Sequence, residues 1–451
     1  MIGLEAISRA VVSFRAASEP SERRIAFGVD ARLDGRGVSD VLANQLDSLA
    51  ADLLEVAAAI YAADRCVLRP RYLGFERGHH WAREISVSIP VREPDRWAGI
   101  KPDLVRLLEW LTDDDWSVTF TTAERPAFSG GQGYLISTLP DDIEPALFSG
   151  GLDSSAGLAL HAGSRALLPV SVQTNPHMTA VQDKVLDGLR AISGSALPAV
   201  RFRVNLNRSL TGVPGVKQES SQRSRGFLFL AAGIAVALTM GKRHLWFFEN
   251  GVGAINLPYL RSQIGSQATR SAHPRTVHEV ARLVGKLADV EFRISTPLLR
   301  MTKAEVISSV ANEYEQVMAE SVSCDTGFAA RVSGHPPCGV CTSCLLRLQA
   351  VLASGYPAID RAKEFRKTPG RQTAELAAML WQASRMERRI SEEDPWAGLV
   401  EEFPEILYAS EFLPAQDLVR LLRAYVREWP QLLSSTGLAV GDWFSEQVRA
   451  F

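Results

Sequence analysis

The sequence predicts an α/β fold built on a doubly wound parallel sheet with helices on both faces. Two observations support this prediction. Between residues 145 and 311, apolar strand-like runs alternate with amphipathic helical patterns, which is typical of parallel strands joined by helices. The first of these strands is followed at once by a glycine pair and a helical pattern. Ligands of such sheets bind beyond the carboxyl ends of the strands, so we expect the chemistry at this turn.

The 451 residues are enough for three domains, and we expect boundaries near residues 142 and 355. Residues 1–142 are predicted to form a separate N-terminal α+β domain. It would have strands at 24–33, 85–91 and 116–123 and helices at about 42–60 and 102–112. The acidic run 113–115 is expected to be a solvated turn. This domain shows no catalytic constellation, so we expect it to bind a partner.

Residues 143–355 are predicted to hold the parallel sheet, and residues 356–451 to be a helical C-terminal region. The expected strands of the sheet are 145–148, 167–172, 199–204, 244–248 and 290–295. The expected helices are 154–163, 178–192, 225–241, 274–288 and 302–311.

Composition excludes several classes of protein. With 49 Lys+Arg against 51 Asp+Glu, the formal charge is −2, which gives no support for nucleic-acid binding or for tRNA modification. The most apolar run, 226–238, is too short to cross a membrane. The N-terminus has no apolar core typical of a signal peptide. We therefore expect a cytoplasmic protein with no membrane or nucleic-acid partner.

The stretch 145–155 reads PALFSGGLDSS, and its turn is suited to an anion. Glycine at positions 150 and 151 lets the backbone approach a ligand closely. The first amides of the following helix point their N–H groups at the turn, as phosphate-binding sites require. Hydroxyl groups at 149, 154 and 155 add donors, and Asp153 stands among them. The alternative is an ordinary N-cap after a tight turn.

Four of the five cysteines lie within 21 residues, at Cys324, Cys338, Cys341 and Cys344. Two overlapping C-x₂-C steps with a fourth thiol can close a tetrahedral Zn²⁺ shell, and a closed shell predicts a structural role. An iron–sulfur cluster could use the same thiols. His335 is an alternative fourth ligand, and Cys66 is expected to be a buried apolar residue.

The run SGGLDSS after ALF resembles the PP-loop of the ATP pyrophosphatase superfamily, which has the adenine nucleotide alpha-hydrolase-like fold. The resemblance implies that ATP is cleaved between its α- and β-phosphates, so that a carboxylate is adenylated and a nucleophile then displaces AMP. It places the pyrophosphate on the loop residues Ser149, Gly150, Gly151, Leu152, Asp153, Ser154 and Ser155.

The stretches TPLLRMTKAEV (296–306), CGVCTSCLLR (338–347) and RGFLFLAAGIA (225–235) narrow the resemblance to the 7-cyano-7-deazaguanine synthase (QueC) family. It implies ATP, Mg²⁺ and structural Zn²⁺ as cofactors, with zinc on the four clustered cysteines. It also implies that 7-carboxy-7-deazaguanine is adenylated, amidated by ammonia and dehydrated to the nitrile. Asp153, Arg225 and Lys303 are the expected catalytic residues. The alternative for Arg225 and Lys303 is that each is an ordinary residue at a helix start.

Three features depart from the family pattern. Thirteen residues separate the first two cysteines of the cluster, Asn256 stands where an acidic residue is expected, and two extra domains flank the sheet. Proteins with such extensions resemble QueC-like members of bacterial anti-phage defence operons. The extensions therefore predict a protein partner from the same operon and an amine of that protein as the acyl acceptor. The alternatives are a free-ammonia synthase and a non-catalytic ATP-binding scaffold of a defence complex.

Overall fold

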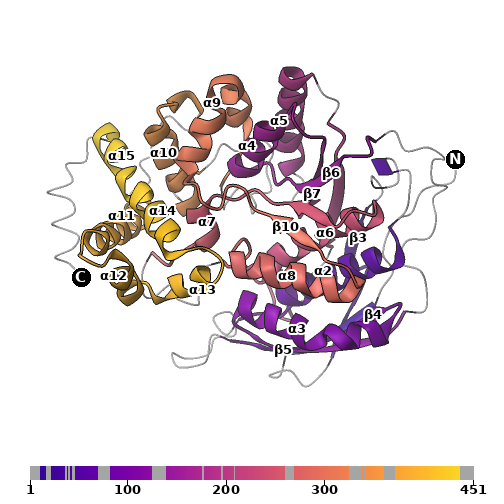
Figure 1. Ribbon diagram of the computed structural model, residues 1–451. Helices are drawn as coiled ribbons and strands as arrows, with labels where there is room; N and C mark the ends of the chain where they lie inside the picture. Colours follow the sequence, from indigo (N-terminus) through magenta and orange to yellow (C-terminus); the bar gives the residue numbers. More distant parts are fainter. Residues whose placement is uncertain are drawn as a thin grey trace.

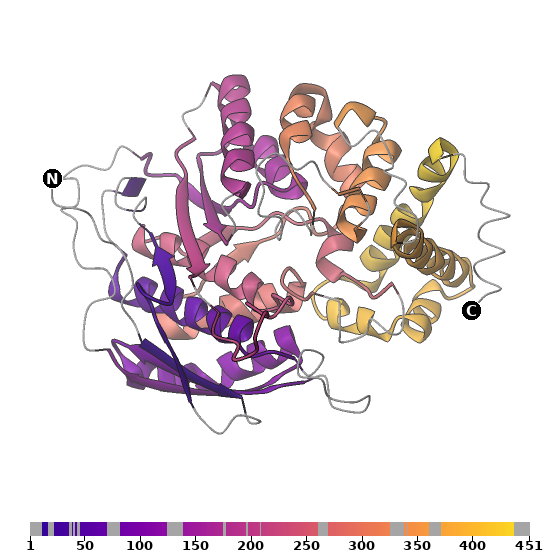
Figure 2. The ribbon, with the colours of Figure 1, turned by 180° about the vertical axis from the view of Figure 1, so that it is seen from behind.

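The computed structural model describes residues 11–16, 22–35, 38, 41–42, 46–69, 82–123, 139–174, 177–194, 197–207, 209–259, 269–324, 338–339, 341–359 and 371–436. Figures 1 and 2 show its layers from two sides: a six-stranded sheet in the centre, helices above and below it, and a second sheet at the bottom. The C-terminal helices pack at one side of the central layers.

The six-stranded sheet confirms the predicted parallel core. Its order is β10-β9-β6-β7-β8-β3, and the first five strands are parallel. The five parallel strands begin and end within a few residues of the predicted runs. Their bounds are β6 (Glu144–Leu147), β7 (Leu167–Gln173), β8 (Val200–Leu206), β9 (His244–Trp246) and β10 (Arg293–Ser295).

Alternate residues of β6 enter two different cores. Ala146 and Phe148 pack with helices α4 (Leu152–His161), α5 (His177–Ser193) and α9 (Lys303–Glu320), whereas Leu147 packs with α6 (Arg225–Thr239) and α8 (Pro274–Ala288). A strand with both faces buried reads as a continuous apolar run, which is why the sequence located it. The sheet is therefore doubly wound, as predicted.

The N-terminal segment is built on a second, four-stranded sheet of order β2-β1-β4-β5. Its strands are β1 (Val11–Ala16), β2 (Arg23–Ala26), β4 (Glu84–Val91) and β5 (Asp115–Thr122), and its helices are α2 (Ser48–Cys66) and α3 (Pro94–Thr112). The predicted strand 24–33 is in fact two strands with a turn between them. The second of these, β3 (Ala31–Asp34), pairs antiparallel with β8 in the six-stranded sheet.

Helix α2 packs on α6, and one continuous apolar core joins the N-terminal segment to a face of the central sheet. A domain boundary at residue 142 thus stays a prediction. Of two elements that precede this residue, β3 is a strand of the six-stranded sheet and α2 packs on its helix α6.

Residues beyond the central sheet are helical where the structure describes them, as predicted. The helices are α10 (Thr342–Ser354), α11 (Arg371–Ile390), α12 (Pro395–Glu402), α13 (Leu407–Ser410), α14 (Ala415–Arg427) and α15 (Trp429–Thr436). They share an apolar core with the short helix α7 (Gly251–Ile255), which follows β9. This contact brings the C-terminal region to the carboxyl end of the sheet.

The acidic run 113–115 is not simply a solvated turn, and the prediction is wrong for Asp114. That carboxylate is 2% exposed and accepts two hydrogen bonds from Arg69, at 2.8 and 3.0 Å, and others from Arg83. Arg83 also pairs with the buried Asp64 of α2. The local sequence could not show this network because its cations come from residues 31 and 45 positions away.

We expect Asp114→Asn to lower the free energy of unfolding by about 3–5 kcal/mol, because it removes the negative charge that the buried Arg69 and Arg83 guanidinium groups share. Glu291→Gln is a matched control, since Glu291 forms an exposed ion pair with Arg293 and such pairs contribute about 0–1 kcal/mol. Urea unfolding of the two variants measures the difference. Equal effects would contradict the assignment of Asp114 to a buried network.

Candidate active site

A cavity of 740 Å³ lies beyond the carboxyl ends of β6 and β9. Its walls come from segments far apart in the sequence: the glycine turn after β6, residues 220–226 before and at the start of α6, and residues 247–259 after β9. Lys303, Val322, Ser323, the start of α10 and Glu375 of α11 complete it. The predicted location of the site at the first strand-to-helix turn therefore lies in the wall of this cavity, as is usual for a ligand site.

The glycine turn has the conformation that its sequence predicts. Gly150 has φ +83°, which only glycine adopts readily, and a Cβ there would lie 3.1 Å from the Gln182 side chain. Gly151 is the N-cap of α4, with extended torsions and no side chain to cover the helix end. The backbone carbonyl of Gly150 accepts a hydrogen bond from the amide of Val322, which fixes the turn against the segment that leads to the cysteines.

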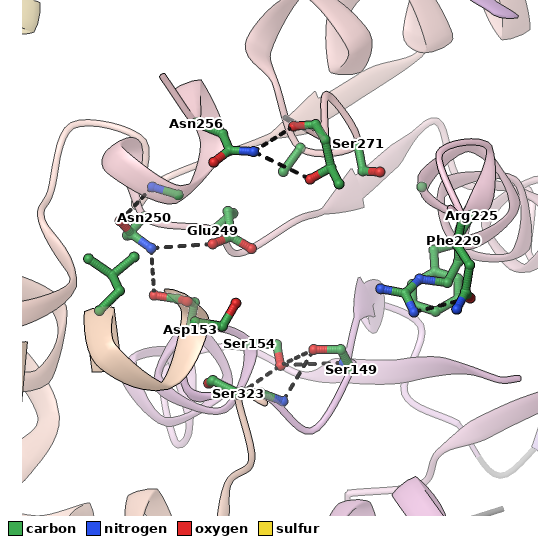
Figure 3. Close-up of a pocket in the computed structure, with 18 of the residues that line it drawn as sticks. Ser149, Asp153, Ser154, Arg225, Phe229, Glu249, Asn250, Asn256, Ser271 and Ser323 are labelled. Carbon is green, nitrogen blue, oxygen red and sulfur yellow. Dashed lines mark hydrogen bonds between the residues drawn. The ribbon is translucent and has the colours of Figure 1, made fainter. Parts of the chain in front are cut away.

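Two hydroxyl oxygens accept hydrogen bonds from the first backbone amides of α4. Ser149 Oγ accepts from the amide of Gly151 at 3.2 Å, and Ser323 Oγ accepts from the amide of Leu152 at 3.3 Å. Ser154 Oγ lies 3.1 Å from Ser149 Oγ (Figure 3). These oxygens occupy the positions that phosphate oxygens take at a helix N-terminus, so the turn fits a phosphate that displaces them.

Asp153 and Lys303 form a buried ion pair in the wall of the cavity. The side chains of Asp153 and Lys303 are 9% and 7% exposed, and the ammonium group of Lys303 donates to Asp153 Oδ2. Lys303 is the first residue of α9, where the helix dipole disfavours a cation. A lysine at this position therefore lowers the stability of the helix. Its ion pair with Asp153 offsets this cost, and the position places the ammonium group in the wall of the cavity.

Two residues that the sequence analysis missed complete this group. Asn250 Nδ2 donates to Asp153 Oδ1 at 3.3 Å and to Glu249 Oε1 at 3.2 Å (Figure 3). Both residues lie within four residues of the end of β9, so their place beyond the carboxyl end of a parallel strand was the signal that could have identified them. Burial and the nearby Asp153 carboxylate raise the pKa of Glu249 to about 8, whereas Lys303 lowers it.

The raised pKa of Glu249 predicts a pH-dependent stability. Between its ordinary value of 4.5 and about 8, the folded protein holds a proton that the unfolded chain releases. The stability contributed by the protonated carboxyl is complete below pH 4.5 and is lost as the pH rises through 8. We therefore expect wild type to lose stability relative to Glu249→Gln over this range, measured by urea unfolding of the free protein. A difference that stays constant with pH would contradict the assignment.

Arg225 lies across the cavity from Asp153 and Glu249, as Figure 3 shows. Its guanidinium group lies 5.7 Å from the centroid of the Phe229 ring, one turn further along α6. Arg225 also donates to Gln222 Oε1 at 3.4 Å. The cavity thus has a cation on each of two sides.

The structure brings most of the predicted site residues together. Six of them line the cavity: Ser149, Gly151, Asp153, Ser154, Arg225 and Lys303. The side chains of Leu152 and Ser155 are fully buried in the protein core, so these two residues can reach a ligand only through their backbone. Asn256 lines the cavity at the end of α7, with φ +46° and its amide group donating to the carbonyl of Thr269.

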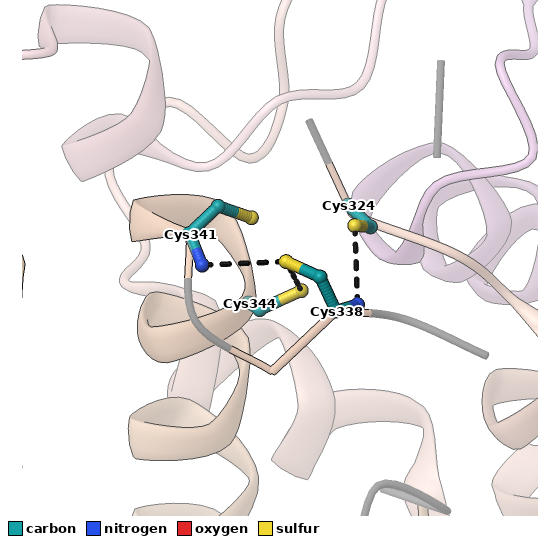
Figure 4. Close-up of side chains that lie close together, drawn as sticks. All are labelled: Cys324, Cys338, Cys341 and Cys344. Carbon is teal, nitrogen blue, oxygen red and sulfur yellow. Dashed lines mark hydrogen bonds between the residues drawn. The ribbon is translucent and has the colours of Figure 1, made fainter. Parts of the chain in front are cut away.

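The four clustered cysteines form a group that fits a tetrahedral metal ion (Figure 4). Their sulfur atoms lie within 4.8 Å of one another, and the sulfurs of Cys338 and Cys344 are 3.9 Å apart. Zinc–sulfur bonds of about 2.3 Å require sulfur–sulfur distances of roughly 3.8 Å. Backbone amides donate to the sulfurs of Cys324 and Cys338, as in thiolate sites.

This donor set is consistent with the predicted zinc site, and the thirteen-residue gap does not keep Cys324 from the cluster. His335 lies outside the described residues. Cys341 also lines the cavity, so the cysteine cluster fixes the start of α10 against the site. Cys66 lies apart in α2 and is buried, as expected.

The fold and the site define an α/β protein with a glycine turn whose geometry fits a phosphate and a four-cysteine cluster consistent with a zinc site. A family profile described as "Queuosine biosynthesis protein QueC" matches residues 269–355. The chain is 31% identical over 237 residues to 7-cyano-7-deazaguanine synthase of Methylococcus capsulatus, covering 47% of this chain and 96% of that protein. It is 29% identical to the synthase of Magnetococcus marinus and 27% identical to that of Ralstonia pickettii, covering 92% and 94% of those proteins.

The chain belongs to the QueC family. Its relatives are ATP-dependent ligases. More than half of this chain has no counterpart in the relative from Methylococcus capsulatus. Within the residues that the structure describes, no helix is long and apolar enough to cross a membrane.

Proposed function

We propose that this protein is an ATP-dependent enzyme that converts 7-carboxy-7-deazaguanine and ammonia into 7-cyano-7-deazaguanine. The observation that carries the proposal is the cavity, in which the glycine turn, the Asp153–Lys303 pair and Arg225 face one space beside the cysteine cluster. Membership of the QueC family supplies the substrate class.

The chain's own residues have distinct tasks in this proposal. The amides of Gly151 and Leu152 bind the pyrophosphate portion of ATP, which enters as its Mg²⁺ complex. Lys303 and Arg225 bind anionic oxygens on two sides of the cavity and stabilise the charge that develops at the α-phosphate. Asp153 holds the Lys303 ammonium group in place. The four cysteines hold zinc, which fixes the start of α10 and takes no part in the reaction.

The substrate carboxylate would attack the α-phosphate of ATP, so that pyrophosphate leaves and an acyl adenylate forms. Ammonia then attacks the acyl carbon, AMP and a proton leave, and the amide results. The amide oxygen attacks the α-phosphate of a second ATP, with loss of pyrophosphate and one N–H proton. Loss of AMP and of the second N–H proton then gives the nitrile.

Incubation of the protein with Mg·ATP, the acid and ammonium tests the proposal. We expect AMP and pyrophosphate to appear only when the acid is present, with masses of the amide and nitrile in the products. ATP binding without AMP formation would instead support the alternative of a non-catalytic ATP-binding scaffold. No AMP with any deazaguanine acid would overturn the substrate assignment.

A second candidate is transfer of the activated acid to an amine of a partner protein, in an anti-phage defence system. The observation that favours it is that more than half of the chain has no counterpart in the Methylococcus capsulatus relative, which is named as a synthase. Intact-mass analysis of proteins encoded beside this one tests it. A partner that gains the mass of the acyl group supports this function, whereas release of free nitrile alone supports the first.

A further inference from the structure

We propose that the N-terminal segment is part of the active site and that Tyr61 of α2 is a positioning residue for Arg225, acting through Gln222. This inference rests on the proposed function of the cavity, and it gives a role to a segment outside the part matched by the family profile. The supporting observations are the contacts between α2 and the segment 219–226, most of which forms one wall of the cavity.

The wall segment is tied to α2 along its length. The backbone amide of Glu219 donates to the carbonyl of Arg65 at 2.8 Å, and the Arg65 guanidinium group donates back to the carbonyl of Glu219. At the other end, Asp64 accepts from the amide of Ser224 at 3.2 Å and from its hydroxyl at 2.7 Å. Ser224 is the N-cap of α6, so Asp64 fixes the residue immediately before Arg225.

Tyr61, unlike these anchors, contacts a residue that lines the cavity. It is 5% exposed, and its hydroxyl donates to Gln222 Oε1 at 3.2 Å. The same oxygen accepts from Arg225 at 3.4 Å. One amide oxygen thus receives a donor from the N-terminal segment and a donor from the predicted catalytic arginine.

This arrangement explains how the Tyr61 hydroxyl affects Arg225. A glutamine side chain presents a carbonyl oxygen at one side and an NH₂ donor at the other. With the Tyr61 hydroxyl in place, the oxygen faces both donors. Without it, the amide can turn, and its NH₂ group would then face the guanidinium group, which has no acceptor. The guanidinium group would lose its hydrogen bond to Gln222, which helps to orient it.

The neighbouring cation, Arg223, forms hydrogen bonds with the N-terminal segment. Arg223 also lies in the wall, but it donates to Asp113 and to the carbonyl of Thr112. Arg225 is thus the cation of this wall that donates to Gln222 and faces the cavity. Its ligand is an anionic oxygen, which comes either from an ATP phosphate or from the carboxylate of the acid.

The test uses Tyr61→Phe and Gln222→Met, singly and together, in the full-length protein. We expect Tyr61→Phe to raise the KM of one substrate about three- to tenfold, the effect of one hydrogen bond, with a smaller change in kcat. The substrate whose KM changes, ATP or the acid, is the one that Arg225 contacts. Because Tyr61 acts through Gln222, adding Tyr61→Phe to Gln222→Met should change the KM no further.

Tyr356→Phe is the matched control, since it also removes a hydroxyl hydrogen bond, to Asn312, but lies outside the cavity. Urea unfolding of each variant separates positioning from stability. Unchanged KM values in Tyr61→Phe, or additive effects in the double variant, would overturn the inference. If wild type forms no AMP, the proposed function fails instead. The same variants are then compared by calorimetric binding of a non-hydrolysable Mg·ATP analogue, where additive or absent effects again overturn the role of Tyr61.

Discussion

Lys303→Met is expected to lower kcat/KM for AMP formation by about 100- to 1,000-fold, the loss that follows removal of one charge-stabilising group from a dry site. Lys303 lies in the wall of the cavity with its ammonium group on Asp153, so the variant removes a cation from the place where the proposed reaction develops negative charge. Steady-state measurement of AMP release gives the value.

The single variant also leaves Asp153 as a buried charge without its partner, which destabilises proteins by about 3–5 kcal/mol. The double variant Asp153→Asn/Lys303→Met is neutral and separates the two effects. We expect it to regain much of the stability but none of the turnover. The control Lys286→Met removes a lysine whose ion pair with Asp103 lies at the surface, and its turnover should equal that of wild type. Recovery of turnover in the double variant would show that the pair is only structural.

Cys344→Ser is expected to abolish zinc binding and to lower the unfolding temperature strongly. Structural zinc contributes about 10–16 kcal/mol in small domains, which is as large as the whole stability of many proteins. The sulfurs lie close together, and hydrogen bonds of the protonated Cys344 thiol with Cys324 and Cys341, together with burial, hold the pKa of Cys344 above its usual range. Four thiolates at these distances would repel one another, and a bound divalent cation would offset that repulsion.

Metal analysis and thermal unfolding check this prediction. Wild type should contain one zinc per chain, and a strong chelator should lower its unfolding temperature to that of Cys344→Ser. The control Cys66→Ala changes a buried cysteine of α2 that lies apart from the cluster, and it should keep the metal. Wild type without zinc but with full stability would contradict a structural metal. Iron with acid-labile sulfide in wild type would favour the iron–sulfur alternative.

The central sheet could be predicted from the sequence because its strands are buried on both faces. The run at 145–148, for example, differs from β6 by one residue at each end. The place of β3 could not be predicted, because a short strand is equally compatible with either sheet until its partner is known. Its partner, β8, lies about 170 residues away, and pairing over that distance leaves no local pattern.

The site was predicted where chemistry follows from a local pattern and missed where it depends on assembly. The glycine turn and the four clustered cysteines each have a residue spacing that can be recognised in the sequence. Glu249 and Asn250 belong to no spaced motif, and their position beyond the end of β9 was the only sequence signal for them. Their contacts with Asp153 and the nearby Lys303 become visible only in the structure. The same holds for Tyr61, which in the sequence is one more apolar residue of an amphipathic helix but in the structure donates to the wall of the cavity.

The most direct test of this account is a crystal structure of the protein with a non-hydrolysable Mg·ATP analogue. We expect the phosphates on the amides of Gly151 and Leu152, in place of the hydroxyls of Ser149 and Ser323, with Lys303 within hydrogen-bond distance of a phosphate oxygen. Nucleotide bound elsewhere, with both hydroxyls still on these amides, would contradict it.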